Sequence, residues 1–293
     1  MKERIKDKLW AAFFIMPQLV GVLVFALFPL CFSFYLSLTN WDGFGEKQLV
    51  GFENFTRQFQ NPDFATALAN TAWYTLLTVP VGIFVSLLVA LALNKIRGKT
   101  IYRVIYYMPV VTSSIAVATV WLWILNADFG LFNLALNRLF GVSGPKWLID
   151  RNLVIPSLAL VNIWWTLGSN MILLLAGLQN IPSTYYEAAE IDGASSFHKA
   201  IHITLPLLSP TTFFCLIMST IRSFQVFDLS FIMTGGGPSK ASYTLVYHIY
   251  REAFVEFSFG KSSATAVILF AIIFALTMFQ SWISKHWVHY ESY

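Results

Sequence analysis

The positions at which charged residues are missing constrain the fold of this chain more than any other feature. Six stretches longer than 20 residues contain no Asp, Glu, Lys or Arg. These stretches are Leu9–Trp41, Phe64–Asn94, Val104–Ala127, Asn152–Tyr186, Ala200–Ile221 and Ser262–Ser284. A bilayer core about 30 Å thick is crossed by roughly 20 apolar helical residues. Because only helices and closed barrels satisfy their backbone within lipid, the chain is predicted to be an all-α, polytopic membrane protein.

The composition supports this prediction and excludes several classes of protein. Only 12% of the 293 residues are charged, about half the share found in soluble domains, and 57% are hydrophobic. These values exclude a soluble enzyme, a nucleic-acid-binding protein and a secreted scaffold. Cys31 and Cys215 lie within charge-free stretches, so neither a disulfide framework nor a metal site is expected. His198 and His202 are four residues apart, but no carboxylate completes a zinc site with them.

We expect a single transmembrane domain over residues 1–293, with six transmembrane helices. The spans are predicted near residues 10–37, 69–93, 104–126, 153–176, 207–227 and 263–284. Met1–Lys8 and Lys95–Arg103 together hold eight Lys and Arg, whereas the loop Asp42–Asp63 between them holds two. Because short cytoplasmic segments collect Lys and Arg, both termini are predicted to be cytoplasmic.

The cytoplasmic segment 177–204 departs from this charge rule. Its acids Glu187, Glu190 and Asp192 are accompanied by a single basic residue, Lys199. A helix that lies on lipid would be basic, so an acidic segment favours docking into a groove of another protein. A solvated loop between two spans is the alternative interpretation.

Two short helices are expected within this segment. Thr184 and Glu187 match a capping box, which predicts that the first helix starts at Thr184. Gly193 is predicted to end it, because glycine accepts the left-handed conformation at helix ends. A second helix is expected from about Ser195, and the Leu205–Pro206 pair opens the next span, where proline is tolerated in a first turn.

The same segment resembles the EAA loop of bacterial ABC importer permeases. The matching pattern is Glu187-Ala188-Ala189-x3-Gly193-x9-Ile203-x-Leu205-Pro206. The residues Ser223–Asp228 and Thr234–Pro238 are similar to the signature of the carbohydrate-uptake branch, and of the first permease subunit of maltose-transporter-like systems. Asn40–Trp41 and Gly51–Phe55 resemble the first external loop of that subfamily. The larger permease of the maltose system differs by additional N-terminal spans and a large external domain.

The resemblance implies an ABC importer type I permease bundle in the bacterial cytoplasmic (inner) membrane, surrounded by lipid. The implied partners are a second homologous permease subunit, two cytoplasmic ATPase subunits and an external substrate-binding protein, with no nucleic acid. The residues that would couple the permease to the ATPase are Glu187, Ala188, Ala189, Gly193, Leu205 and Pro206. The chain has no Walker A pattern, so ATP and magnesium are expected on the ATPase subunits and no cofactor on this chain.

Polar residues of the fourth predicted span are candidates for a substrate path. Asn162, Thr166, Ser169 and Asn170 recur on one helix face, and Trp165 lies next to that face. Amide groups and an aromatic ring would suit a carbohydrate. Hydrogen bonding between helices is the alternative role for these side chains.

Arg222 is the one strong charge within a predicted span, and such residues usually serve function. It would bind a substrate hydroxyl or an acidic group, pair with another subunit, or extend outward to the head groups. We also assign Gln225 to the candidate path. The glycine-rich external loop is expected to form a turn, or a flexible loop that reaches the delivered substrate; its residues are Gly235, Gly236, Gly237 and Pro238.

The predicted function is therefore that of a permease subunit that moves oligosaccharides, or related sugars and polyols, by alternating access. Acidic glycans and glycerol phosphates stay among the possible substrates. An ion-coupled carrier that acts alone is the alternative, but such carriers use acids within the membrane and the six stretches contain none. An intramembrane enzyme would need a metal cluster or a nucleophile–base pair, and the sequence suggests neither.

Overall fold

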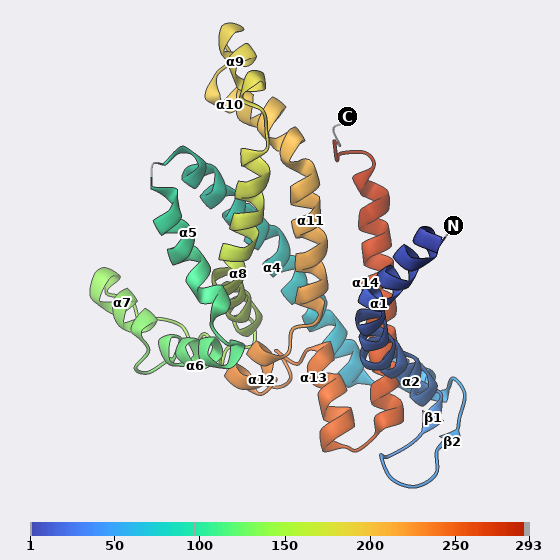
Figure 1. Cartoon of the computed structure of the whole chain (residues 1–293). Helices are drawn as coiled ribbons and strands as arrows, with labels where there is room; N and C mark the ends of the chain where they lie inside the picture. The colour runs from blue at the N-terminus through green and yellow to red at the C-terminus, as the bar shows by residue number, and fades with distance from the viewer. Residues whose placement is uncertain (1, 97, 290–293) are drawn as a thin grey trace. The chain divides into compact units, whose positions relative to one another are not determined.

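Long apolar helices coincide with the charge-free stretches in the computed structural model, which describes residues 2–96 and 98–289 (Figure 1). Five continuous helical segments are long and apolar enough to cross a membrane. They are Trp10–Ser37, Pro62–Asn94, Val154–Gln179, Ser196–Phe224 and Phe259–Ser284. A bent helix pair brings the number of spans to six when the pair is counted as one. The predicted all-α, six-span architecture is confirmed.

The chain divides into two compact units, and the first comprises the residues up to Pro62 together with Ile249–Phe270. Its elements are α1 (Lys2–Val22), η1 (Leu23–Leu27), α2 (Phe28–Ser37), β1 (Thr39–Asn40), β2 (Gln48–Leu49), α3 (Glu53–Gln60), η4 (Arg251–Val255) and the start of α14 (Phe259–Ser284). The two short strands pair antiparallel. The first unit therefore consists of the first span, the first external loop and half of the last span.

Asn54 holds the first external loop in place. Its Nδ2 donates to the carbonyl oxygens of Ser37, at 2.9 Å, and Thr39, at 2.8 Å. Asn54 is buried, so both bonds are shielded from water. Gly260 of α14 packs on the same strand, since a Cβ there would lie 2.0 Å from the Thr39 carbonyl oxygen. Asn54 of the segment Gly51–Phe55 therefore has a structural role, which is to fix the loop to the end of α2 and to β1.

The second unit comprises Asp63–His248 and the residues from Ala271 onward. Its elements are α4 (Pro62–Lys95), α5 (Lys99–Tyr107), η2 (Met108–Val111), α6 (Ser114–Ile124), α7 (Leu131–Phe140), α8 (Val154–Gln179), α9 (Ser183–Ile191), α10 (Ser196–Lys199), η3 (Ala200–Thr204), α11 (Leu205–Phe224), α12 (Asp228–Thr234), α13 (Leu245–Tyr250) and the rest of α14. This unit contains all of the predicted path and coupling residues.

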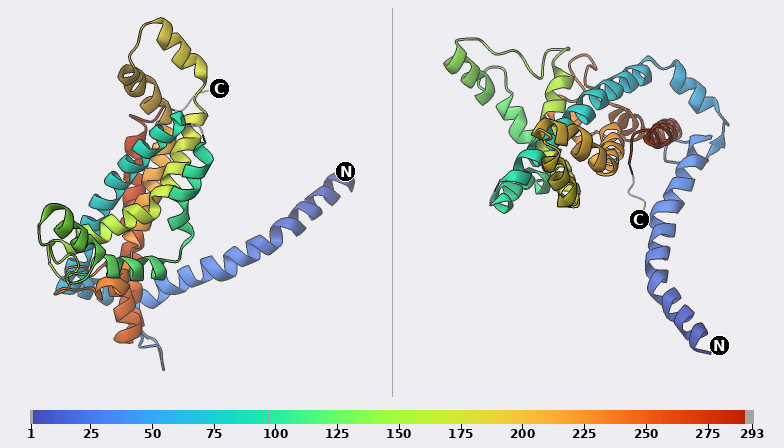
Figure 2. Two further views of the ribbon diagram at one scale, coloured as in Figure 1. Left: turned by 90° about the vertical axis from the view of Figure 1, so that its left-hand side faces the viewer. Right: turned by 90° about the horizontal axis from the view of Figure 1, so that it is seen from above.

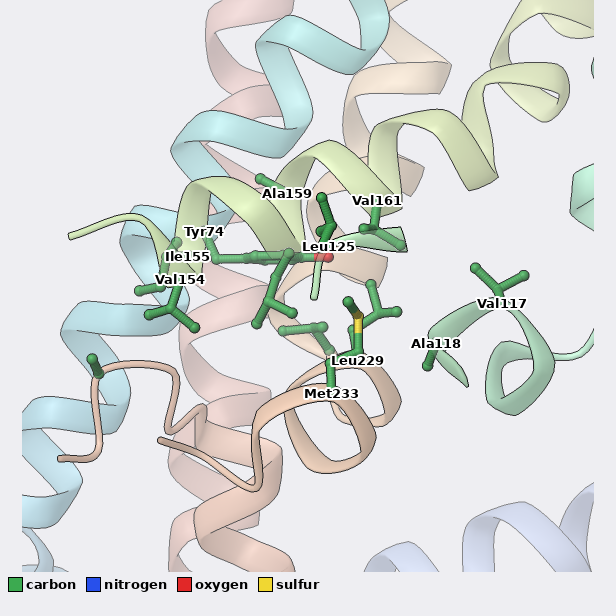
Figure 3. Close-up of a cluster of buried hydrophobic side chains, with 13 residues drawn as sticks. Tyr74, Val117, Ala118, Leu125, Val154, Ile155, Ala159, Val161, Leu229 and Met233 are labelled. Atoms are coloured by element: carbon green, nitrogen blue, oxygen red, sulfur yellow. The ribbon is translucent and has the colours of Figure 1, made fainter. Parts of the chain in front are cut away.

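Two clusters of buried apolar side chains hold the second unit together. Figure 3 shows one of them, in which Tyr74 of α4, Val154 of α8, Leu229 of α12 and Val117 of α6 take part. The other cluster lies between α4, α8 and α11 and includes Leu174, Leu208 and Cys215. Helices α4, α8 and α11 therefore form the central layer of this unit.

The segment between α8 and α11 lies at the same end of the second unit as the end of the chain. The backbone amide of His289 donates to Ser209 Oγ, in the first turns of α11, at 2.9 Å. Helices α9 and α10 project beyond this end of α8 and α11 (Figure 2). This is the arrangement that a cytoplasmic C-terminus and a cytoplasmic segment 177–204 require.

The third span is not the single helix that was predicted over residues 104–126. The segment formed by α5 and the 3₁₀ turn η2 meets α6 at 97°. Pro109 lies in the turn and has no amide hydrogen to continue a helix. Ser113 then caps α6 by accepting from the amide of Ala116 at 3.3 Å. The prediction was wrong because it used the length of the apolar stretch and ignored these two residues.

The end of α5, just before the break in the third span, packs against α8 at Gly168. A Cβ at this buried glycine would lie 2.2 Å from the carbonyl oxygen of Tyr106 and 2.8 Å from the Cα of Tyr107. Non-helical backbone at membrane depth is tolerated only where protein or a cavity covers it. The absence of a side chain at Gly168 lets α8 cover the end of α5.

Replacing Gly168 with Ala should destabilise the protein by about 1–3 kcal/mol, because the new methyl group has no room against the backbone of the third span. The midpoint of thermal unfolding in detergent would measure the loss. Gly82→Ala on α4 is the matched control, since its Cβ would meet only Ile163 Cγ1, at 3.7 Å. Equal midpoints for the two variants would contradict the packing described here.

Candidate functional site

The polar face of α8 and the C-terminal end of α11 border a cavity of about 300 Å³. The predicted path residues that line it are Asn162, Trp165, Thr166, Ser169, Arg222 and Gln225. Asn170, the remaining one, lines an adjoining cavity of about 40 Å³, which shares Asn162, Thr166 and Arg222 with the first. The structure thus brings together all the residues assigned to the path from two separate spans.

The polar side chains of α8 differ in how they are bonded. Asn170 is buried and its Nδ2 donates to Ser219 Oγ of α11 at 3.3 Å, which is hydrogen bonding between helices. Thr166 Oγ1 donates to the carbonyl oxygen of Asn162, one turn earlier, at 2.8 Å. Within the described residues, the side chains of Asn162 and Ser169 form no hydrogen bond. Asn162 and Ser169 are therefore the better candidates for contact with a solute.

Trp165 combines a packed ring with an unused donor. Its ring packs against the buried cluster of Figure 3, and its half-buried side chain also borders the cavity. The buried indole Nε1 has no hydrogen-bond partner within the part of the chain that the structure describes. A buried donor without a partner costs about 1–3 kcal/mol. Trp165 therefore packs in the core with its ring and borders the cavity at the same time.

Two opposite charges line the larger cavity. Arg222 lies in the last turn of α11 and Asp228 in the first turn of α12, positions at which the helix dipoles stabilise a cation and an anion. Among residues 2–96 and 98–289, the Arg222 side chain has no hydrogen bond and no ion pair. The guanidinium is exposed to the cavity and is available to a ligand.

The coupling candidates lie on a projecting pair of short helices. Helix α9 begins at Ser183 after Pro182, whose side chain makes no capping bond, so Thr184 is inside the helix and the predicted capping box is wrong. Gly193 follows the helix with φ +75°, as a left-handed glycine at a helix end. Ser195 caps α10 by accepting from the His198 amide at 3.3 Å, close to the predicted start.

The surface of this projecting segment is unusual for a solvated loop. Glu187 and Ala188 are exposed, and Ala189 is half-buried. The apolar side chains of Ile191 and Phe197 are 87% and 74% exposed. Exposed apolar side chains next to acids are typical of a surface that another protein covers. Leu205 and Pro206 lie apart from this surface, in the first turn of α11.

Comparison with known proteins identifies the family. The model of the family described as "binding-protein-dependent transport system inner membrane component" matches residues 78–289. The chain belongs to this family. The sn-glycerol-3-phosphate transport system permease protein UgpA of Brucella abortus is 36% identical over 99% of each chain. The probable ABC transporter permease YesP of Bacillus subtilis is 36% identical over 98% of this chain and 94% of its own length.

Two further comparisons agree with this membership. The sulfoquinovosyl glycerol transport system permease SmoG of Agrobacterium fabrum is 33% identical over 92% of this chain and 89% of its own length. In a crystal structure of a bacterial alginate ABC transporter, one chain superposes with a TM-score of 0.83, at 22% identity, over 97% of this chain and 96% of that chain. The protein is thus an inner-membrane permease with the ABC importer fold.

The glycine-rich segment of this permease is an ordered turn. Gly235 ends α12 with φ +57° and Gly236 follows with φ +78°. Gly237 donates its amide to the Thr234 carbonyl oxygen at 2.9 Å, and Pro238 accepts from the Ala241 amide at 2.8 Å. These bonds support the turn that was predicted rather than the flexible loop.

Sequence reasoning missed several residues that border the two cavities. Asp228 belongs to the segment Ser223–Asp228 that resembles the carbohydrate-uptake signature, so the signal was present, but its place beside Arg222 depends on the turn between α11 and α12. Val110 borders the cavity because the third span breaks there. Thr78 and Ser219 carried no signal beyond being polar within spans.

Replacing Trp165 with Phe should lower the thermal unfolding midpoint of the permease only by the packing of the removed ring atoms, because the lost indole N–H has no partner to leave unpaired. Ser219→Ala, which removes the acceptor of the Asn170 bond, should lower the midpoint and serves as the comparison. A loss of stability in W165F that exceeds the packing of the removed ring atoms would contradict the unpaired indole N–H.

Proposed function

We propose that this permease moves sugars, polyols or their phosphate esters from an external binding protein into the cytoplasm by alternating access. The observation that carries the proposal is the cavity of the second unit, whose lining combines an indole ring, amides, hydroxyls and an unpaired guanidinium. Aromatic faces and hydrogen-bonding side chains suit polyhydroxylated solutes. The names of relatives such as the sn-glycerol-3-phosphate and sulfoquinovosyl glycerol permeases support the same class of solute.

The energy for transport would come from separate subunits. ATP and magnesium would bind to two cytoplasmic ATPase subunits, and a second homologous permease would complete the pathway. The acidic and apolar surface of α9 and α10 supports docking on the ATPase, with Glu187, Ala188, Ala189 and Gly193 in the docked segment. Leu205 and Pro206 would carry the movement into α11 as its first turn.

Glu187→Lys and Gly193→Val should uncouple solute uptake from ATP hydrolysis. The first variant reverses a charge on the docked surface, and the second strains a backbone held at φ +75°. Uptake and ATP hydrolysis would be measured on the complete transporter in proteoliposomes, with the affinity of the binding protein for its sugar expected to stay the same.

Glu46→Lys, on the predicted external loop, is the control and should behave like the wild type, because Glu46 is exposed and lies in the first unit. Normal uptake after removal of the ATPase subunits would instead favour a carrier that acts alone.

If the substrate carries a negative charge, Arg222→Gln should raise its half-saturating concentration about tenfold or more, since a hydrogen bond to a charged group contributes about 1.5–3 kcal/mol. Uptake of a neutral sugar should change little. The comparison would use glycerol phosphate and glycerol, or an acidic and a neutral oligosaccharide.

Arg138→Gln, at an exposed cation of α7, is the control for the loss of one positive charge. Equal effects of R222Q on charged and neutral solutes would overturn the role of Arg222 in recognising the anion.

A further inference from the structure

Helices α10, η3 and α11 form one continuous rod. The helical segment runs without interruption from Ser196 to Phe224, across the π-helical turn Ala200–Thr204. Its beginning belongs to the projecting segment, and its end carries Arg222 at the cavity. Arg222 follows Lys199 by 23 positions, which correspond to about 35 Å at 1.5 Å per residue. A displacement at the start of this rod therefore reaches the cavity through helix alone.

Helix α9 precedes this rod and is separated from it in sequence by the turn at Gly193. Two side-chain contacts join α9 to the rod within the part of the chain that the structure describes. Glu190 Oε1 of α9 lies 2.7 Å from Lys199 Nζ. Tyr186 Oη lies 3.1 Å from Thr204 Oγ1. Both contacts connect α9 to the first three turns of the rod.

A cavity of about 540 Å³ lies between this pair of helices and the end of α4. Tyr186, Glu190, Lys199 and Thr204 line one side of it, and Leu91 and Ala92 of α4 line the other. Both polar contacts between α9 and the rod therefore lie at the border of this cavity.

The hydrogen bond from Lys199, with its positive charge, lowers the pKa of the Glu190 carboxyl. The side chain of Lys199 is only 16% exposed, whereas that of Glu190 is 67% exposed. Surface ion pairs contribute little to stability, so the loss of this pair should leave the permease folded.

We propose that the Glu190–Lys199 ion pair, with the Tyr186–Thr204 hydrogen bond beside it, is the link through which α9 moves the α10–α11 rod. The inference rests on the proposed function, because it assumes that α9 docks on an ATPase. Glu190 and Lys199 are positioning residues in this mechanism: they fix the angle between the docked helix and the helix that borders the solute cavity.

The test compares Glu190→Lys, Lys199→Glu and the double exchange of both charges in the complete transporter, reconstituted in proteoliposomes. Solute uptake per ATP hydrolysed is the readout, with copurification of the ATPase as a check on assembly. Each single variant should lower this ratio about fivefold or more, within the usual range of coupling energies. The double exchange should restore it to within about twofold, because it restores the pair in the opposite direction.

Asp192→Lys combined with Lys199→Glu is the matched control, since Asp192 is an acid of the same segment that lies outside the pair. This combination should not restore coupling.

Wild-type ratios in the single variants would overturn the inference. A double exchange as defective as the single variants would also overturn it, because Glu190 would then act on the ATPase directly. If Glu187→Lys and the single variants all keep the wild-type ratio, the proposed docking of α9 on the ATPase fails. If Glu187→Lys uncouples transport and the single variants do not, only the link between α9 and the rod fails.

Discussion

The structure depends on one constraint, which is that a backbone surrounded by lipid must make its hydrogen bonds within the protein. This constraint turns the charge-free stretches into helices, and it makes every departure from a helix informative. The break between η2 and α6 is the largest departure, and the end of α5 just before it packs closely on Gly168 of α8. The same break places Val110 at the cavity. The departure from the helix thus brings the third span to the cavity.

The polar groups of α8 and α11 divide between structure and function according to their partners. Asn170 and Ser219 bond to each other and tie the two helices together. Arg222 lines the cavity and has donors that the described part of the chain leaves unused. An unpaired guanidinium beside a cavity favours a role in binding a ligand over a role in folding.

Much of the fold could be predicted from the sequence, because span positions depend on the absence of charge over a fixed length. Five of the spans and the turn at Gly193 follow from this local chemistry. The break in the third span and the start of α9 at Ser183 could not be predicted from apolar length or a short motif, since Pro109 and Pro182 decide them. The candidate cavity was predicted as a set of residues, but Asp228 joins it only through the turn after α11.

The thickness of the bilayer also explains why one helix can reach from the Glu190–Lys199 pair to the cavity. A rod of about 35 Å between Lys199 and Arg222 slightly exceeds the hydrocarbon core of about 30 Å. A helix of this length can keep Lys199 at one interface, where an ion pair with Glu190 costs little to form, and Arg222 at the other, where a guanidinium is tolerated. No Asp, Glu, Lys or Arg lies between these two residues, so in the proposed mechanism α11 would transmit the displacement of α9 to the cavity along its uncharged length.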